Sequence, residues 1–201
     1  MRAVIIGNGD IADYEYIKSR LSQEDFIICA DGGIRHTVGL GVKPNIVIGD
    51  FDSAAGSEGV EKCVYPTDKD FTDGELAVSY AMENGYDEIL MIAMTGKRLD
   101  HTLTNIFQLT RRSGISLVDE NNEIFAVWDT LKICNRKEKT LSVIPVFGDL
   151  TGVTITGMKY PLNNETLYFA EGRGNSNVIT EDECTISVKS GIGIVLINNG
   201  E

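Results

Sequence analysis

The chain has 201 residues, of which 42% are hydrophobic and 24% are charged. This composition is typical of a folded globular protein with one domain or two small ones, and it argues against an intrinsically disordered chain. The formal net charge of −12 argues against a nucleic-acid backbone or an anionic membrane as partner, because no basic face is available to bind phosphates. A small or metal-bound anion is still compatible with this charge.

The apolar runs are shorter than the roughly 20 residues that a membrane-spanning helix needs, and the first residues resemble a β-strand more than a signal peptide. We therefore expect a cytoplasmic protein. The cysteines are scattered singly without a CxxC pair, which argues against a zinc site and against a disulfide framework. We expect reduced thiols, mostly in the core, at Cys29, Cys63, Cys134 and Cys184.

Up to about residue 125, short β-branched runs alternate with helical segments, which is typical of βαβ units and a parallel sheet. Residues 11–21 have apolar side chains at steps of three and four and predict an amphipathic helix. Residues 72–82 predict another, with Thr72 as N-cap and Glu75 as its capping-box partner. The strands expected in this part are residues 3–6, 26–30, 46–48, 89–93 and 115–118.

After about residue 123 the helical periodicity stops, and short β runs separated by Gly, Asn, Asp and Pro predict a sandwich or barrel of antiparallel strands. We expect these strands at residues 124–128, 141–145, 153–156, 166–169, 185–188 and 193–197. A domain boundary is therefore predicted near residue 125. The charge agrees with it, since the first part has 21 acidic and 11 basic residues and the remainder has 9 and 7.

Ligands of a parallel α/β sheet bind at the carboxyl ends of its strands. In this sequence the segments that follow the predicted strands are polar and rich in glycine, as in Gly7-Asn8-Gly9-Asp10 and Asp31-Gly32-Gly33. Such ends are consistent with a phosphate-bearing ligand. The glycine pattern alone is weak, because residues 7–9 lack the later glycine of GxGxxG, and no GxxxxGK[ST] occurs. Ser53 lacks the GxSxG context of a hydrolase nucleophile.

The aspartate carboxylates are the most specific functional signal at these strand ends. Asp50 and Asp52 alternate across Phe51, so both point the same way in an extended stretch. Asp31 ends a neighbouring strand, and Asp73 starts a helix. Converging acids repel one another unless a hard cation lies between them, and oxygen ligands suit Mg²⁺. Each Asp taken singly could instead be an ordinary turn or helix-cap residue.

Basic residues lie among these acids. Arg98 suits bidentate contact with phosphate, whereas Lys69 and Lys97 could bind phosphate or form solvated salt bridges. His101 is predicted to open a helix, where it could touch a nucleotide or lie unengaged in the first turn. His36 is expected on a helix surface.

Four segments together resemble, in order and spacing, the signature blocks of the thiamine pyrophosphokinase family. They are Ala30-Asp31-Gly32-Gly33, Gly49-Asp50-Phe51-Asp52-Ser53, Asp70-Phe71-Thr72-Asp73 and Arg98-Leu99-Asp100-His101. The resemblance covers most of residues 1–110 and continues more loosely through residues 174–177 and 187–191.

The resemblance implies an α/β fold in which an N-terminal Rossmann-like parallel-sheet domain precedes an antiparallel β-sandwich domain. Residues 1–125 would bind ATP and Mg²⁺, and residues 126–201 would bind thiamine and form a homodimer with a shared active site. The implied reaction transfers pyrophosphate from ATP to the thiamine hydroxyl and yields thiamine diphosphate and AMP.

The resemblance also implies roles for individual residues, block by block. The implied Mg²⁺ ligands are Asp31, Asp50, Asp52 and Asp73. The implied catalytic residues are Asp73, Asp100 and Arg98. The implied ATP contacts are Asn8, Lys69, Thr72, Arg98 and His101. The implied thiamine contacts are Asp100, Ser176 and Asn177.

Two positions depart from the family pattern. Lys69 stands where relatives often have Gln, and Cys184 is the nearest equivalent of an aromatic residue that some members stack on thiamine. Two other functions share the same acids: a Mg²⁺-dependent phosphohydrolase or kinase acting on another small alcohol, and a non-catalytic module that binds nucleotide or thiamine.

Overall fold

The computed structural model describes residues 1–49, 59–64 and 70–200. The chain forms two compact units, residues 1–120 and residues 121–201. The division lies five residues before the expected position at 125, because β7 (Asn122–Val127) pairs with β13 (Ser190–Asn198) and so belongs to the second unit.

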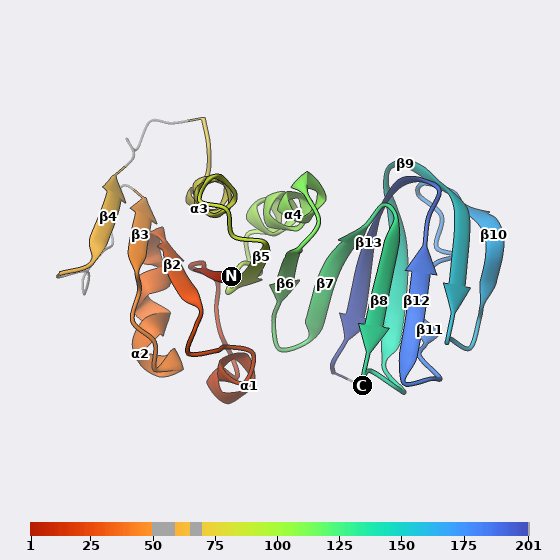
Figure 1. Cartoon of the computed structure of the whole chain (residues 1–201), viewed down its shortest axis with the longest axis horizontal. Coiled ribbons are helices and arrows are strands. Elements are labelled where there is room, and N and C mark those ends of the chain that lie inside the picture. Colours follow the sequence, from red (N-terminus) through yellow and green to blue (C-terminus); the bar gives the residue numbers. More distant parts are fainter. Residues whose placement is uncertain (50–58, 65–69, 201) are drawn as a thin grey trace. The chain divides into compact units, whose positions relative to one another are not determined.

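The first unit contains a parallel sheet with the strand order β4-β3-β2-β1-β5-β6 (Figure 1). β1 and β5 are neighbours at the point where the order reverses, and ligands of such sheets bind outside the carboxyl ends there. The bounds are β1 (Arg2–Ile6), β2 (Phe26–Ala30), β3 (Ile46–Gly49), β4 (Glu61–Val64), β5 (Glu88–Ile92) and β6 (Ile115–Val118).

The predicted strands of this unit are confirmed. Their side chains are buried on both faces of the sheet. In β3 all four residues are buried, and in β1 and β5 all but the first are. β4 was not predicted: its sequence Glu-Lys-Cys-Val is charged and exposed at the sheet edge, so it lacks the apolar run that marks an inner strand.

Helices cover both faces of this sheet, with α1 and α2 on one side and α3 and α4 on the other (Figure 1). α3 begins after Thr72 with the predicted capping box complete. α1 is much shorter than the predicted helix over residues 11–21, because Asp13 caps its first turn and Ser19 ends it. The bounds are α1 (Tyr14–Lys18), η1 (Asp31–His36), α2 (Thr37–Leu40), α3 (Asp73–Glu83), α4 (Leu99–Gln108) and η2 (Leu109–Arg111).

The second unit is built from antiparallel strand pairs, as predicted. β9 (Thr140–Thr156) pairs with four of the other strands and contributes to a core of buried hydrophobic residues. The remaining strands are β8 (Thr130–Cys134), β10 (Leu162–Leu167), β11 (Asn177–Val178) and β12 (Glu183–Ser187).

β9 is one continuous strand where the sequence predicts two, over residues 141–145 and 153–156. The glycines between those segments indicate turns, but the chain passes through Phe147 at φ +63° and Gly148 at φ +138° without leaving the sheet. A register shift in the pairing with β13 lies beside this irregularity.

Two further expectations are tested by the fold. All four cysteines are free thiols, as predicted, but only Cys29 and Cys184 are buried; Cys63 is half-buried and Cys134 is exposed. Among the described helices, none combines the length and the apolar character that crossing a bilayer requires.

Candidate active site

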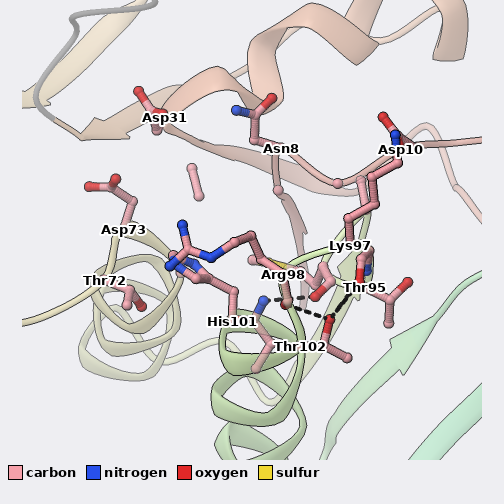
Figure 2. A pocket seen from close by; sticks show the side chains of 18 of the residues that line it. Asn8, Asp10, Asp31, Thr72, Asp73, Thr95, Lys97, Arg98, His101 and Thr102 are labelled. Atoms are coloured by element: carbon pink, nitrogen blue, oxygen red, sulfur yellow. Dashed lines mark hydrogen bonds between the residues drawn. The ribbon is translucent and has the colours of Figure 1, made fainter.

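A cavity of about 530 Å³ lies at the carboxyl ends of β1, β2 and β5, where the sequence predicts the ligand site (Figure 2). Four chain segments line it, namely residues 7–10, 30–31, 71–74 and 93–98, together with the first turns of α4. The structure thus brings together polar segments that are up to about 90 residues apart in the sequence. Asp50, Asp52 and Lys69 lie outside the described residues.

Asp31 and Asp73 face this cavity from different elements, and Figure 2 shows them on the side away from Asp10 and Lys97. Asp31 follows β2 in the left-handed region at φ +45°, which is uncommon for a residue with a side chain. Its Oδ1 atom is buried and accepts no hydrogen bond from the described residues. A buried carboxylate oxygen without a donor is costly, so this atom is suited to a ligand that brings positive charge.

Two helix N-termini also open onto the cavity. Thr72, Asp73 and Gly74 form the start of α3, and His101 lies in the first turn of α4. Helix N-termini carry partial positive charge and free N–H groups, which favour anions such as phosphate. The Thr72 hydroxyl already accepts a hydrogen bond from the Glu75 N–H at 3.2 Å, and its O–H can still donate to a ligand.

Arg98 and Asp100 form a bidentate ion pair at the rim of the cavity. Arg98 donates from Nε and Nη2 to the two Asp100 oxygens at 2.9 and 2.6 Å. Hydrogen bonding to Arg98 holds the pKa of Asp100 well below its usual range, and it raises the pKa of Arg98. Asp100 is therefore a poor proton acceptor in this arrangement, and only Arg98 of the two lines the cavity.

The loop after β1 lies close to the segment after β5. The Gly9 N–H donates to the Ala93 carbonyl at 2.7 Å, and a Cβ on Gly9 would collide with the carbonyl oxygens of Thr95 and Ala93. Ala93 itself has φ +53°. Strained backbone at two strand ends of one cavity is typical of a binding site. Asn8 lines the cavity from this loop, and its role as an ATP contact stays a prediction.

His36 does not lie on a helix surface, so that prediction is wrong. It is 3% exposed, its Nδ1 lies 2.7 Å from the Tyr14 hydroxyl, and its Nε2 lies 2.8 Å from the Gly9 carbonyl oxygen. Burial, and then the nearby Arg35 charge, lower the pKa of His36, although the Gly9 carbonyl and Asp10 act in the opposite direction. The ring is therefore neutral near pH 7.

Sequence reasoning missed polar residues that shape the cavity from α4. Asn105 is 8% exposed and donates from Nδ2 to the Met94 carbonyl at 2.8 Å. The Thr102 hydroxyl donates to the Arg98 carbonyl at 3.1 Å and accepts from the Gly96 N–H at 3.2 Å. The signal was available, because Arg98, Thr102 and Asn105 recur at helical spacing on one face.

Ser176 and Asn177, the expected thiamine contacts, lie in the second unit. Ser176 is exposed with φ +58°, and its N–H donates to the Ser142 hydroxyl at 3.0 Å. Asn177 is 7% exposed, and its amide both accepts from the Tyr160 N–H at 3.0 Å and donates to the Tyr160 carbonyl at 2.8 Å. The Asn177 side chain is therefore engaged with the backbone of its own unit. Cys184 is 1% exposed and lies in the core of this unit.

Comparison with known proteins identifies the family to which these features belong. Residues 17–119, slightly more than half of the chain, match the family model described as "Thiamin pyrophosphokinase, catalytic domain". Residues 130–193 match the model described as "Thiamin pyrophosphokinase, vitamin B1 binding domain". A thiamine pyrophosphokinase of Bacillus subtilis is 33% identical over 184 residues, which are 84% of this chain and 85% of that protein.

Solved structures agree with the sequence matches. The crystal structure of thiamine pyrophosphokinase from Bacillus subtilis superimposes with a TM-score of 0.89 at 26% identity and covers 100% of both chains. The structure from Geobacillus thermodenitrificans has a TM-score of 0.85 at 26% identity and covers 98% of this chain and 97% of its own. The mixed α/β fold is also shared with the yeast enzyme, at a TM-score of 0.77, 17% identity and coverage of 98% and 86%. The chain therefore belongs to the thiamine pyrophosphokinase family.

Proposed function

We propose that this chain catalyses the ATP-dependent pyrophosphorylation of thiamine in the cavity of its first unit. The thiamine hydroxyl would attack the β-phosphorus of ATP, the bond between the α–β bridging oxygen and the β-phosphorus would break, and AMP would leave as thiamine diphosphate forms. Such a transfer requires little covalent chemistry from the protein, but it requires alignment and neutralised phosphate charge. The second unit is proposed to be the β-sandwich that binds thiamine, beside a Rossmann-like first unit.

The observation that carries this proposal is the pair of carboxylates in the cavity. Asp31 and Asp73 come from different elements, and the buried Asp31 Oδ1 atom accepts no hydrogen bond from the described residues. A carboxylate in this state, beside two helix N-termini that favour phosphates, fits a site shared by a hard cation and an anion. We therefore propose that Asp31 and Asp73 hold Mg²⁺, with Asp50 and Asp52 as further ligands outside the described residues.

Bound Mg²⁺ would supply positive charge to the phosphates. Arg98 would add to that charge from the cavity rim, and its bidentate pair with Asp100 would fix the plane of the guanidinium. Because Arg98 keeps the pKa of Asp100 low, we assign Asp100 to orienting Arg98 and contacting thiamine and not to accepting the hydroxyl proton. We then assign the orientation of the hydroxyl to Asp73, which lines the cavity.

We assign ATP to Asn8, Thr72, Arg98 and His101, which all line the cavity, and to Lys69 outside the described residues. The side chains or backbone amides of these residues can donate hydrogen bonds, which the phosphate oxygens and the rest of a nucleotide can accept. A cytoplasmic location is part of this proposal and stays a prediction.

We also propose a homodimer in which Ser176 and Asn177 of one subunit contact thiamine at the other subunit's cavity. Large apolar side chains of the second unit support an interface, since Phe147, Tyr168 and Phe169 are 68%, 52% and 55% exposed.

A mixture of Asp73→Asn and Ser176→Ala chains tests the arrangement. Shared sites predict that mixed dimers regain activity above the sum of the separate variants. If dimers that are shown to be mixed gain no activity, that result contradicts a shared site.

The reaction is tested by incubating the protein with ATP, Mg²⁺ and thiamine, omitting each in turn, and resolving the nucleotides by chromatography. Thiamine-dependent AMP would support pyrophosphoryl transfer. ADP or inorganic phosphate formed without thiamine would favour a phosphohydrolase or another kinase, and unchanged ATP would favour a binding module.

A further inference from the structure

Three side chains lie behind the loop that carries Asn8 into the cavity. Arg35 donates from Nη2 to the carbonyls of Asn8 and Gly9, both at 2.9 Å. His36 is buried, with Nε2 at 2.8 Å from the same Gly9 carbonyl and Nδ1 at 2.7 Å from the Tyr14 hydroxyl. Arg35, His36 and Tyr14 themselves are absent from the residues that line the cavity.

These contacts fix the orientation of the loop peptides. Carbonyl and N–H groups point in opposite directions across a planar trans peptide. Tying the Asn8 carbonyl to Arg35 therefore turns the Gly9 N–H the other way, where it meets the Ala93 carbonyl at 2.7 Å. Tying the Gly9 carbonyl to Arg35 and His36 likewise turns the Asp10 N–H away from them. The carbonyl oxygens, which would repel phosphate, are held on the outer side of the loop.

The contacts of His36 fit two tautomers of the neutral ring. With the proton on Nε2, the ring donates to the Gly9 carbonyl and accepts from the Tyr14 hydroxyl through Nδ1. With the proton on Nδ1, the ring donates to the Tyr14 oxygen, and Nε2 accepts from Arg35 Nε. The Arg35 Nε atom lies 3.1 Å from His36 Nε2. A doubly protonated, positively charged ring would therefore lie next to the positive charge of Arg35. The titratable and charged groups around the ring are Tyr14 of α1, Arg35 of η1 and Asp10 of the loop.

We propose that Tyr14, Arg35 and His36 are positioning residues that hold the loop over residues 7–10 ready for the nucleotide phosphates. This inference rests on the proposed use of the cavity for ATP. A loop that is already ordered loses less conformational entropy when the ligand binds, so removing its supports weakens binding more than it slows the chemical step.

The test compares steady-state kinetics of His36→Leu, His36→Gln, Tyr14→Phe and Arg35→Gln with the unaltered enzyme. We expect His36→Leu and Arg35→Gln to raise the KM for ATP by about tenfold, with kcat changed by less than about threefold. His36→Gln keeps one donor toward Gly9 and should recover most of that loss. The KM for thiamine should stay within about twofold, because the loop faces the nucleotide.

Arg112 provides a matched control on the same sheet. Its Nη2 also donates to two backbone carbonyls, those of Tyr86 and Asp87, at 2.9 and 2.6 Å. These carbonyls precede β5 at the end of the sheet opposite to the cavity. Arg112→Gln should therefore leave the KM for ATP unchanged even if it lowers the melting temperature.

Hydrogen exchange of the Gly9 amide, measured without nucleotide, gives a readout independent of catalysis. Faster exchange in His36→Leu than in Arg112→Gln supports the inference. Unchanged exchange together with an unchanged KM for ATP would overturn it, and so would equal effects on the KM values for ATP and thiamine. If the unaltered enzyme forms no thiamine-dependent AMP, the proposed function fails, while the exchange result still reports on the support of the loop.

Discussion

In residues 1–120 the partly buried Asp31 carboxylate has one buried oxygen, Oδ1, without a hydrogen-bond donor among the described residues, whereas in residues 121–201 the buried Asn177 amide bonds on both sides to the Tyr160 backbone. The buried Glu123 of the second unit is likewise held by both arms of Arg136, at 2.9 and 3.0 Å. The second unit thus uses these polar groups for its own stability. Among its described residues, the first unit leaves one such oxygen unsatisfied, at the site that we propose binds a ligand.

The largest expected effect lies in the first unit. Asp73→Asn should lower kcat by at least about a hundredfold, because the site loses one of its proposed Mg²⁺ ligands, while the circular dichroism spectrum stays unchanged. Glu83→Gln is the matched control, since Glu83 ends the helix that Asp73 begins. Near-normal turnover of Asp73→Asn would remove this carboxylate from the proposed metal site.

The second expectation concerns the second unit and stability. Arg136→Ala leaves the Glu123 carboxylate, whose side chain is 6% exposed, without its guanidinium, and should lower the free energy of unfolding by about 3 kcal/mol. Urea denaturation measures this loss. Lys132→Ala is the control, because its ion pair with Glu183 is exposed on both sides. Equal losses in the two variants would contradict the difference between buried and exposed pairs.

The third expectation concerns pH. The pKa of His36 is lowered from 6.5 in the folded chain, mainly by burial, so the unfolded chain binds the proton more readily. The contribution of this residue to stability is then complete above pH 6.5 and is lost as the pH falls through the lowered pKa. Unfolding free energies measured between pH 5 and 7 should show a weaker pH dependence in His36→Gln; an identical dependence would contradict this.

The smallest expected effect concerns the alkylation of cysteine thiols in the two units. Burial raises the pKa of Cys29 in the first unit to about 12 and that of Cys184 in the second to about 11. Both should resist alkylation in the native protein, whereas the exposed Cys134 should react. Mass spectrometry after brief iodoacetamide treatment identifies the labelled residues. Rapid labelling of Cys29 would indicate that the sheet of the first unit opens readily.

How far the sequence predicts the structure also differs between the units. The inner strands of the first unit were predictable because burial on both faces requires continuous β-branched runs, as in β3. β9 was predicted as two strands because the glycines at 148 and 152 indicate turns, and only the pairings with β13 and β10 show that the sheet continues through them. Tertiary pairing overrides a local turn signal there.

For the candidate site, the sequence predicts the acids and the strand ends but not the supports behind them. Asp31 and Asp73 follow from their positions after a strand and at a helix start. The contact of His36 with Gly9 joins residues 27 positions apart and leaves no local pattern. The pairing of Arg98 with Asp100 was also unpredictable, since two residues at this spacing point different ways in a regular helix.

The strand pairings have a consequence for the order in which the two units fold during synthesis. The described sheet of the first unit is complete once Val118 has been made. In the second unit, β7 and β9 both await β13, which ends at Asn198. Because domains fold as units while the chain is being made, the first unit can close its sheet early. The edge of β9 that pairs with β13 stays unpaired until β13 has been made, and an unpaired strand edge is a site at which other chains can add during synthesis.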